Sequence, residues 1–377
     1  MVCRQFSWWW AASGKVKKHS MEVRNILVIR FRRIGDSVLS MALCHSLKQT
    51  FPAANVDLVI NKGIHTLYEN HPDVDHVIAF DYDENHSICR YLAKVWRTTH
   101  ATRYDVIIDM RSTLKTLWFS VFSLSTPFRI GSRKGYGKWI LNYRIDNHNN
   151  QLSRIQQNNM LLHPLAGIAE IKTSEEFRLY VGDDDRLRFR RYMQNQGIDF
   201  SRPVIAIAHT ARLKYKEWPE RYMKEILRRL LERYDIQIIL NFADDAEYRC
   251  ALQYQKELDY DSNIFVNIKA GSLTDLCALI VNCDFFFGNE GGPRHIAQAL
   301  GVPAYAIYPP GIHKSLWLPD EGLRFSGISS DDFMPESEQN GRCMDYDARM
   351  RLIDIESVWN GLCTALRNNV TDLRGAK

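Results

Sequence analysis

The segment 288–301, GNEGGPRHIAQALG, shows on a small scale how this chain is expected to fold. The apolar run 284–288 predicts a buried strand that ends here, and Gly291 and Gly292 allow a tight turn. Pro293 favours the first turn of a helix. Because the first N–H groups of a helix lack partners within it, they suit an anion, and the helix dipole adds to this preference. The segment therefore predicts a strand, a turn and a helix, with an anion site at the turn.

The same alternation of strand and helix extends in both directions from this segment. The expected strands of the second half of the chain are 204–209, 236–242, 264–267, 284–288 and 304–308. The expected helices are 219–234, 246–258, 273–282, 293–300 and a last amphipathic one at 351–367. Short continuous apolar strands between amphipathic helices are typical of a parallel sheet that helices cover on both faces.

An equivalent series occupies the first half of the chain. Its expected strands are 25–31 (NILVIRF), 56–60, 75–80 and 105–110, with a short edge strand at 129–131. Its expected helices are 36–50, 87–98 and 113–124. The alternation weakens in the charge-rich segment 171–202, where we place the domain boundary. The fold class predicted is α/β, with two Rossmann-like domains and a ligand cleft between them at the carboxyl ends of the strands.

Composition sets limits on the function. The chain has 377 residues, of which 45% are hydrophobic and 25% charged, so disorder, collagen and coiled coil are excluded as overall descriptions. No apolar run approaches the roughly 18 residues of a membrane-spanning helix. The net charge is +5, but residues 1–20 hold four basic side chains and no acid, so the remainder is nearly neutral. The eight cysteines form no C-x-x-C pair, and we expect reduced core thiols.

Residues 1–20 also contain Trp8, Trp9 and Trp10 in a row and lack the pattern of a signal peptide. Tryptophan and lysine both favour a membrane surface, so an interfacial anchor is one interpretation. A disordered extension ahead of Met21 is the other, and it is favoured because a coherent fold begins directly after that residue.

Three groups of polar residues follow expected strands. Asp36, after the RFRRIG turn, is either the cap of the next helix or a carboxylate base that faces the cleft, and the two roles are compatible. Arg212, Lys214 and Lys216 suit a phosphate or diphosphate, or form a solvated loop. Glu290 is expected to bond sugar hydroxyls or to orient a neighbouring group. His295 is either a packed histidine or a phosphate donor.

Two further patterns are weaker. Residues 129–144 carry five cations and no acid, with Tyr136, Trp139 and Tyr143 between them, so they face an anionic glycan, a lipid head group, nucleic acid or only solvent. Asp81 and Asp83 form a D-x-D pair of the kind that holds a metal under a diphosphate, but such short acidic matches are frequent by chance. We expect no metal and no cofactor.

Three segments, taken in order, resemble glycosyltransferase family 9, the heptosyltransferases of lipopolysaccharide core synthesis. They are the R-x-x-x-x-G-D turn at 30–36, the K-x-W-P segment at 216–219 and the segment E-G-G-P-x-H-I-A-x-A-L-G-x-P at 290–303. The resemblance covers nearly all of residues 24–365. It implies the GT-B fold, with 21–175 as the acceptor domain and 176–345 as the nucleotide-sugar domain. It also implies a C-terminal segment, 346–377, whose helix packs back on the first domain.

The resemblance assigns roles to particular residues. It makes Asp36 the general base. The residues it implies for the donor are Lys216, Thr210, Arg212, Glu290, Gly291, Gly292 and His295. The cations expected to hold the acceptor are Arg33, Arg111, Lys115 and Arg133. The implied reaction is inverting transfer of a heptose or related sugar from an ADP-linked donor to an anionic glycolipid, without metal or nucleic acid, in the cytoplasm and in peripheral contact with the inner membrane face.

The sequence departs from the family pattern at two places. Glu290 and Gly291 stand where the family usually has Asp and then Ser or Thr, which puts the donor sugar in doubt more than the reaction. Ser112 replaces a glycine after Arg111. The alternatives left open are a transferase using another nucleotide-sugar, a sugar-nucleotide 2-epimerase and a non-enzymatic sensor.

Overall fold

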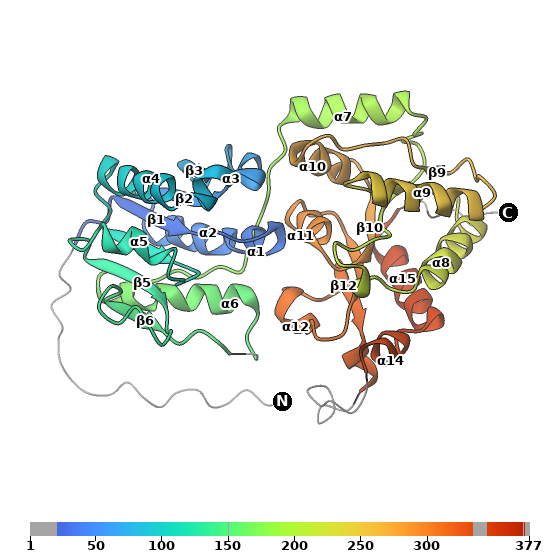
Figure 1. The fold of residues 1–377 in the computed structure, drawn as a ribbon. Helices are drawn as coiled ribbons and strands as arrows, with labels where there is room; N and C mark the ends of the chain where they lie inside the picture. The colour runs from blue at the N-terminus through green and yellow to red at the C-terminus, as the bar shows by residue number, and fades with distance from the viewer. Residues whose placement is uncertain (1–20, 150, 335–344, 372, 374–377) are drawn as a thin grey trace.

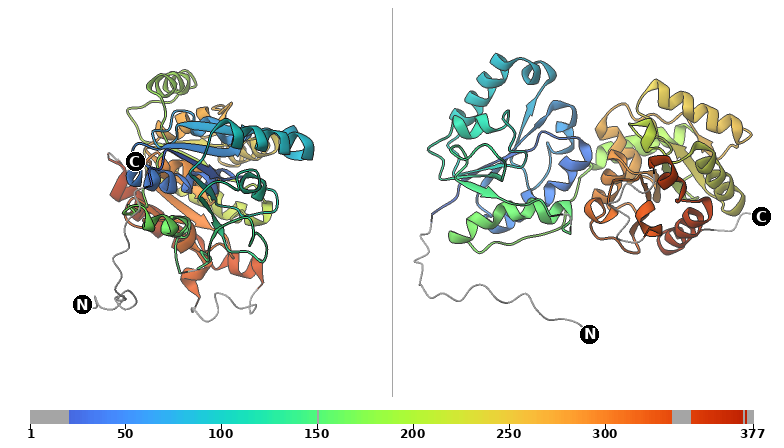
Figure 2. Two further views of the ribbon diagram at one scale, coloured as in Figure 1. Left: turned by 90° about the vertical axis from the view of Figure 1, so that its left-hand side faces the viewer. Right: turned by 60° about the horizontal axis from the view of Figure 1, so that its bottom comes forward.

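The computed structural model describes residues 21–149, 151–334, 345–371 and 373. It contains two α/β halves that lie side by side, joined by one extended segment that runs past α1 and α2 to α7 (Figure 1). Two further views show the same division (Figure 2). The expected extension 1–20 lies outside the described residues.

The two sheets have the same strand order. The first runs β3-β2-β1-β4-β5-β6 and the second β12-β11-β10-β7-β8-β9, and every pairing is parallel. Their strands are β1 Asn25–Ile29, β2 Asn55–Asn61, β3 His76–Phe80, β4 Val106–Asp109, β5 Phe128–Ser132, β6 Tyr143–Ile145, β7 Val204–Ala208, β8 Gln237–Leu240, β9 Ile264–Phe265, β10 Phe285–Asn289, β11 Ala304–Tyr308 and β12 Phe325–Ser329. Each sheet is doubly wound, so the predicted fold class is confirmed.

Helices cover both faces of each sheet. Those of the first half are α1 Ile34–Leu39, α2 Met41–Thr50, η1 Lys62–Leu67, α3 Tyr82–His86, α4 Ile88–Ala101, α5 Leu117–Val121, α6 Arg154–Asn159 and η2 Met160–Gly167. Those of the second half are α7 Asp183–Asn195, η3 Lys214–Lys216, α8 Glu220–Arg233, α9 Asp245–Glu257, α10 Leu273–Val281, α11 Gly292–Ala299, α12 Lys314–Trp317, η4 Ser330–Phe333, α14 Tyr346–Arg351 and α15 Ile355–Asn369.

Strand alternation explains how the apolar side chains divide between layers. In β1, Ile26 and Val28 point to one face, and Leu27 and Ile29 point to the other. The face with Ile26 belongs to a cluster that continues into the second half, where it includes Ala206 of β7. One apolar core therefore spans both halves of the molecule.

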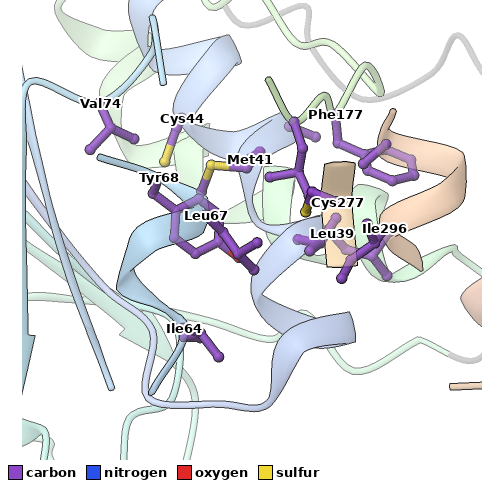
Figure 3. Packing of buried hydrophobic residues seen from close by; sticks show 14 of the residues in the cluster. Leu39, Met41, Cys44, Ile64, Leu67, Tyr68, Val74, Phe177, Cys277 and Ile296 are labelled. Atoms are coloured by element: carbon purple, nitrogen blue, oxygen red, sulfur yellow. The ribbon is translucent and has the colours of Figure 1, made fainter. Parts of the chain in front are cut away.

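The junction of the halves is made by α1 against α11 and by η1 against α10. Leu39 and Met41 of the first half lie in the same buried cluster as Cys277 and Ile296 of the second (Figure 3). Phe177 of the connecting segment joins them there. Hydrophobic burial contributes roughly 25 cal/mol per Å² of apolar surface, so this contact stabilises one relative placement of the halves.

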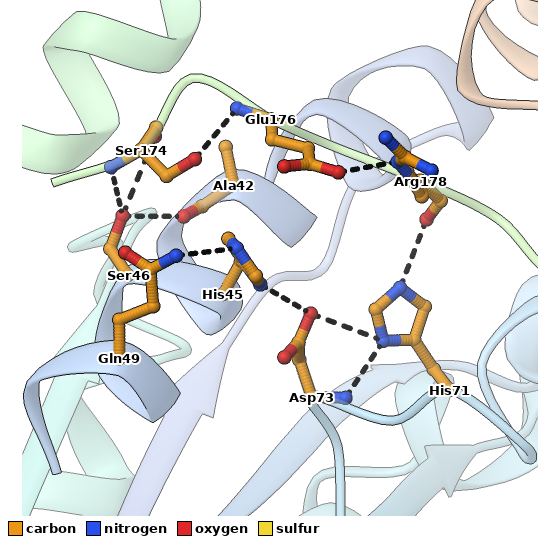
Figure 4. A network of polar contacts seen from close by, with 9 residues as sticks. All are labelled: Ala42, His45, Ser46, Gln49, His71, Asp73, Ser174, Glu176 and Arg178. Atoms are coloured by element: carbon orange, nitrogen blue, oxygen red, sulfur yellow. Dashed lines mark hydrogen bonds and ion pairs between the residues drawn. The ribbon is translucent and has the colours of Figure 1, made fainter. Parts of the chain in front are cut away.

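Polar contacts hold the connecting segment on the first half (Figure 4). The backbone N–H of Ser174 donates to Oγ of Ser46 at 2.9 Å. His71 donates from Nε2 to the carbonyl of Arg178 at 2.9 Å, while its Nδ1 accepts from the N–H of Asp73. Burial lowers the pKa of His71, which fits this neutral tautomer.

Several expected boundaries change in the structure. The expected helix 36–50 is two helices, with the break at Ser40. The helix expected at 113–124 is limited to α5, and the charge-rich boundary segment contains α7, which packs on α10. Four cysteines are buried as free thiols: Cys44, Cys277, Cys283 and Cys363. Among the described residues, no helix combines the length and apolar character needed to span a bilayer.

The expected position of the last helix is wrong. Instead of packing on the first domain, α15 lies on β11, β12 and α8 of the second half. Its apolar face, with Val358 and Leu362, belongs to the core on that side of the second sheet. The segment before it is fixed there too, because Nε1 of the buried Trp218 donates to the carbonyl of Ile353 at 2.8 Å.

Candidate functional site

The strand orders define where ligands are expected. In both sheets the winding direction reverses next to the central strand, between β1 and β4 and between β7 and β10. The crevice outside the carboxyl ends of the strands at this reversal is the usual ligand site of doubly wound folds. The segments that leave these four strands include Asp36, Arg111, Lys216 and Glu290.

Asp36 is placed inside the first turn of α1. The N-cap of this helix is Arg33, whose side chain makes no capping bond, so the interpretation of Asp36 as the cap is wrong. One carboxylate oxygen of Asp36 lies 3.0 Å from the guanidinium of Arg30, and the other lies 3.7 Å from Arg32. The side chain is partly exposed, and the carboxylate is therefore held in place without being closed off from a ligand.

Arg30 is the fixed partner in this ion pair. It is buried, and it also donates to the carbonyls of Asp36 and Met110. Burial lowers the pKa of Arg30 to about 10, against the opposing effect of Asp36, so the guanidinium stays charged at neutral pH. A charged, buried donor orients the Asp36 carboxylate.

Two more arginines interact electrostatically with the Asp36 carboxylate. Arg154, at the start of α6, interacts with the charges of Asp36 and Arg32, and its guanidinium lies 5.1 Å from the ring centre of Trp317 in the second half. Arg111 interacts with the same two charges and donates to the carbonyl of Phe31 at 2.9 Å. Sequence reasoning found Arg111 but missed Arg30, Arg32 and Arg154. Arg154 follows the N-cap residue Ser153, and nothing in the local sequence indicates that it interacts with Asp36.

In the second half, one asparagine connects the two segments that resemble the family, 216–219 and 290–303. The side chain of Asn289, at the end of β10, accepts from the N–H of Trp218 at 2.8 Å and donates to the carbonyls of Ala208 and His209. It thereby joins the segment after β7 to the start of the 290–303 segment. Asn289 positions the turn that carries Lys216, and sequence reasoning did not identify it.

A buried chain of polar contacts follows directly. A terminal nitrogen of Arg294 lies 2.6 Å from Nδ1 of His295, and Nε2 of His295 lies 3.1 Å from Oε1 of Glu290. Burial, aided by the charge of Arg294, lowers the pKa of His295 to about 4, so this histidine is neutral at pH 7. Because Nδ1 accepts a hydrogen bond from Arg294, the single proton of the neutral ring is on Nε2, which donates to Glu290. His295 is therefore buried in this structure, with Glu290 as one of its hydrogen-bond partners. The expected contacts of both residues with the donor stay predictions.

Glu290 remains ionised in this position. Burial raises the pKa of its carboxyl, but the hydrogen bond from His295 and the charges of Arg294 and Lys216 outweigh that effect and lower the pKa. Lys216, in η3, is therefore electrostatically coupled to the same group. Thr210 and Arg212 lie on the loop before it, and Arg212 is exposed.

The starts of α1 and α11 meet across the junction. A Cβ built on Gly35 would lie 2.7 Å from Cδ2 of His295, and one built on Gly292 would lie 3.3 Å from Cβ of Ile34. The glycines allow this close approach. Asp36 of one half is thereby brought next to the Gly291–Gly292 turn of the other.

The first half also has a cavity of about 790 Å³ at the carboxyl edge of its sheet. Phe31 and Phe80 supply aromatic surface, and Arg111 and Lys115 are among its polar lining residues. Nζ of Lys115 donates to the carbonyl and side chain of Asn85, so this lysine shapes the wall of the cavity. The cavity is large enough for a sugar unit beside the crevice.

Other expected residues lie away from this cavity. Arg33 and Arg133 are exposed and do not line it. Arg129 donates to three backbone carbonyls, those of Ile140, Leu124 and Thr126, and so has a structural role.

Acidic residues of the candidate metal pair and of the segment after β8 have local partners. Asp81 caps α3 in a capping box with Glu84. Asp244 caps α9, and Glu247 accepts from the N–H of Ala243 at 2.6 Å. In the described part of the chain, no three of the His, Cys, Asp or Glu side chains are grouped as a metal would need.

Comparisons with known proteins agree with this architecture. The model of glycosyltransferase family 9 (heptosyltransferase) matches residues 92–316. Lipopolysaccharide heptosyltransferase 2 of Escherichia coli K12 is 23% identical over 297 residues, which cover 76% of this chain and 82% of that protein. Lipopolysaccharide heptosyltransferase 1 of Pseudomonas aeruginosa is 20% identical over 303 residues, covering 76% and 78%.

Solved structures show the same fold. A family 9 glycosyltransferase from Veillonella parvula superposes with a TM-score of 0.77 at 16% identity and covers 93% of this chain and 100% of its own. The ADP-heptose lipopolysaccharide heptosyltransferase II of E. coli gives 0.68 at 18% identity, covering 91% and 99%. The family match extends over more than half of the sequence and includes the crevice segments from Arg111 to Glu290. This chain therefore belongs to glycosyltransferase family 9 and is a glycosyltransferase of the GT-B fold.

Proposed function

We propose that this enzyme transfers a heptose from an ADP-linked donor to an anionic glycolipid of the lipopolysaccharide core type, with inversion at the anomeric carbon. The observation that carries the proposal is the position of Asp36. This carboxylate is held by Arg30 at the start of α1, directly beside the Gly291–Gly292 turn at the start of α11.

The donor is assigned to the second half. The unpaired N–H groups and the dipole of α11 favour its diphosphate, and Lys216 adds a positive charge. Glu290 contacts His295 and interacts with the charge of Lys216, and its carboxylate suits the hydroxyl groups of the sugar. Structures of the E. coli heptosyltransferase WaaC have been solved with ADP and with ADP-2-deoxy-2-fluoro heptose, which supports an ADP-linked donor.

The proposed reaction uses these positions. Asp36 takes the proton of an acceptor hydroxyl as its oxygen bonds to the anomeric carbon. The bond from that carbon to the diphosphate breaks, and its electron pair leaves with ADP. Lys216 and the start of α11 stabilise the charge that develops on the leaving phosphate. Attack from the face opposite the diphosphate inverts the configuration.

The acceptor is assigned to the first half. The cavity next to Arg111 offers aromatic surface for a sugar ring, and Arg111, Arg32 and Arg154 surround Asp36 with positive charge. Charge-assisted bonds from guanidinium groups suit phosphate or carboxylate groups on the acceptor. The relatives whose names specify lipopolysaccharide support this substrate class.

The test is Asp36→Asn, with nucleotide binding and transfer measured separately. We expect ADP, among ADP, UDP, GDP and CMP, to stabilise both proteins against heat. Acceptor-dependent ADP release should fall by about 10²–10⁴-fold in the variant. Asp185→Asn, on the exposed face of α7, is the matched control. Transfer within a few-fold of the parent would refute the base, and ADP release that needs no acceptor would refute the transferase reaction.

A further inference from the structure

One aromatic side chain of the second half, Trp317, lies against Arg154 of the first half. Trp317 is the last residue of α12, and its ring centre lies 5.1 Å from the guanidinium carbon of Arg154 at the start of α6. Cation–π attraction holds a guanidinium over an indole ring, and it is stronger where water is excluded. Both side chains are partly buried, and burial lowers the pKa of Arg154. The pair is therefore a shielded contact between the two halves.

Trp317 is fixed to α11, the helix to which the donor diphosphate is assigned. A terminal nitrogen of the fully buried Arg294 in α11 donates to the carbonyl of Trp317 at 2.6 Å. Nε2 of Gln298, one turn further along α11, donates to the carbonyl of Pro319 at 2.6 Å. The ring of Trp317 lies edge-on to that of His295, with 5.9 Å between ring centres. Because α11 holds both its backbone and its ring, Trp317 should move with that helix.

Arg154 is held from the other side by the first half. Its Nη1 donates to Oε1 of Gln157 at 2.9 Å. The side chain of Gln157 is fixed in turn, because this buried residue also donates to the carbonyls of Asn149 and Leu152. The guanidinium of Arg154 is thus fixed by an amide of its own half and by an indole of the other half.

One donor of Arg154 is left without a partner. Its Nε is buried, and among the described residues no acceptor lies within hydrogen-bond distance of it. A buried N–H group without an acceptor is costly, and an oxygen atom of a bound anion would remove that cost. The charges of Asp36 and Arg32 both act on Arg154, so an anion bound there would lie close to the proposed base.

We propose that Trp317 is a positioning residue of the acceptor site. Its ring holds the guanidinium of Arg154 close to Asp36, where Arg154 binds a phosphate or carboxylate group of the acceptor. The acceptor hydroxyl is thereby placed within reach of the Asp36 carboxylate. The inference rests on the proposed function, which supplies the anionic acceptor. It adds that the second half, to which the donor is assigned, completes the anion site of the acceptor.

The experiment measures transfer to a phosphorylated lipopolysaccharide core oligosaccharide freed of its lipid, with kcat and the KM for this oligosaccharide determined separately. We expect Trp317→Leu to raise the KM about tenfold and to change kcat less, because a cation–π contact that orients Arg154 is lost. Trp317→Phe keeps an aromatic face and should stay within about threefold of the parent. Calorimetric titration should show that ADP affinity changes by less than about twofold in both variants.

A double-mutant cycle tests whether Trp317 acts through Arg154. Arg154→Gln removes the cation, so adding Trp317→Leu to that variant should raise the KM no further. Additive effects of the two substitutions would overturn the inference, because Trp317 would then act independently of Arg154. A Trp317→Phe variant as impaired as Trp317→Leu, or a loss of ADP affinity equal to the rise in KM, would also overturn it, since the role of Trp317 would then be structural.

Trp359→Leu is the matched control. Trp359 is partly buried on α15, and the guanidinium groups of Arg229 and Arg233 lie 5.9 and 5.7 Å from its ring centre, so the same kind of pair is lost outside the crevice. This variant should transfer as the parent does, and thermal unfolding checks that every variant folds. Transfer by the parent with an unchanged KM in Trp317→Leu would overturn the inference alone. No transfer by the parent would refute the proposed function, and the inference with it.

Discussion

Gly35 of α1 lies directly against the imidazole of His295 in α11, with only 2.7 Å between the Cβ position of the glycine and Cδ2 of the histidine. The two residues belong to different halves of the molecule and adjoin Asp36 and the Gly291–Gly292 turn. The spacing between Asp36 and the Gly291–Gly292 turn therefore depends on the absence of one methyl group.

Gly35→Ala should push the two helix starts apart. Overpacking a tight contact typically costs about 1–3 kcal/mol, and misplacing reacting groups by about 1 Å costs up to about 10²-fold in rate. We expect lower stability in urea and a larger loss of transfer than of ADP binding. Gly63→Ala is the control, because nothing lies within 4 Å of its Cβ position. Equal behaviour of the two variants would disprove the role of this contact.

Lys216→Ala should weaken ADP binding about tenfold, since one charge-assisted bond to phosphate is worth roughly 1.4 kcal/mol or more. Lys214→Ala provides a comparison within the same turn: Lys214 is exposed and paired with Glu217 at 2.7 Å. Calorimetric titration of both variants with ADP checks this. If Lys214→Ala weakened binding as much as Lys216→Ala, the effect would belong to the net charge of the loop.

Ser112 has a left-handed backbone, with φ of 45°, where the family usually has glycine. Its Oγ offsets part of this strain by donating to the carbonyl of Asp109 and accepting from the N–H of Ser132. Ser112→Ala loses both bonds and keeps the strain, whereas Ser112→Gly loses the bonds and removes the strain. Urea denaturation should rank the parent above Ser112→Gly and Ser112→Gly above Ser112→Ala, the last two differing by about 1–2 kcal/mol. Equal stability of the two variants would contradict strain at this position.

Stability should fall as the pH decreases from about 6.5 to about 4. Burial lowers the pKa of His209 and of His295 to about 4 and also lowers that of His71, while histidines in the unfolded chain keep values near 6.5. In this interval the unfolded state binds more protons than the folded state. For each extra proton, the free energy of unfolding falls by about 1.4 kcal/mol per pH unit as the pH decreases. Urea denaturation midpoints measured across the interval give the slope of stability against pH. His209→Gln should make it shallower, and an unchanged slope would exclude His209 as a contributor.

The sequence was informative where local patterns decide the structure. The apolar strands β1 and β11 and the turn before α11 were predicted because buried parallel strands and glycine turns have strong signatures. The strand β12, FSGIS, was missed because it is short, partly polar and contains glycine. The helix α7 was missed because only Phe189 and Met193 on it are buried, so it shows no apolar period.

The partners of the site residues could not be predicted in the same way. Asp36 was identified from its place after a strand, but Arg154 reaches it from a helix more than a hundred residues away in the sequence. The same holds for Asn289, whose role depends on the meeting of two distant segments. Such contacts are properties of the tertiary fold, and a single sequence has no local signal for them.

The apolar core that joins Leu39 and Met41 to Cys277 and Ile296 also affects how this protein unfolds. Neither half can lose its structure without exposing the buried face of the other, so the free energies of the two halves are coupled. Unfolding should therefore be a single cooperative transition, although the chain has two sheets. A half expressed alone would present this apolar face to water and would tend to aggregate.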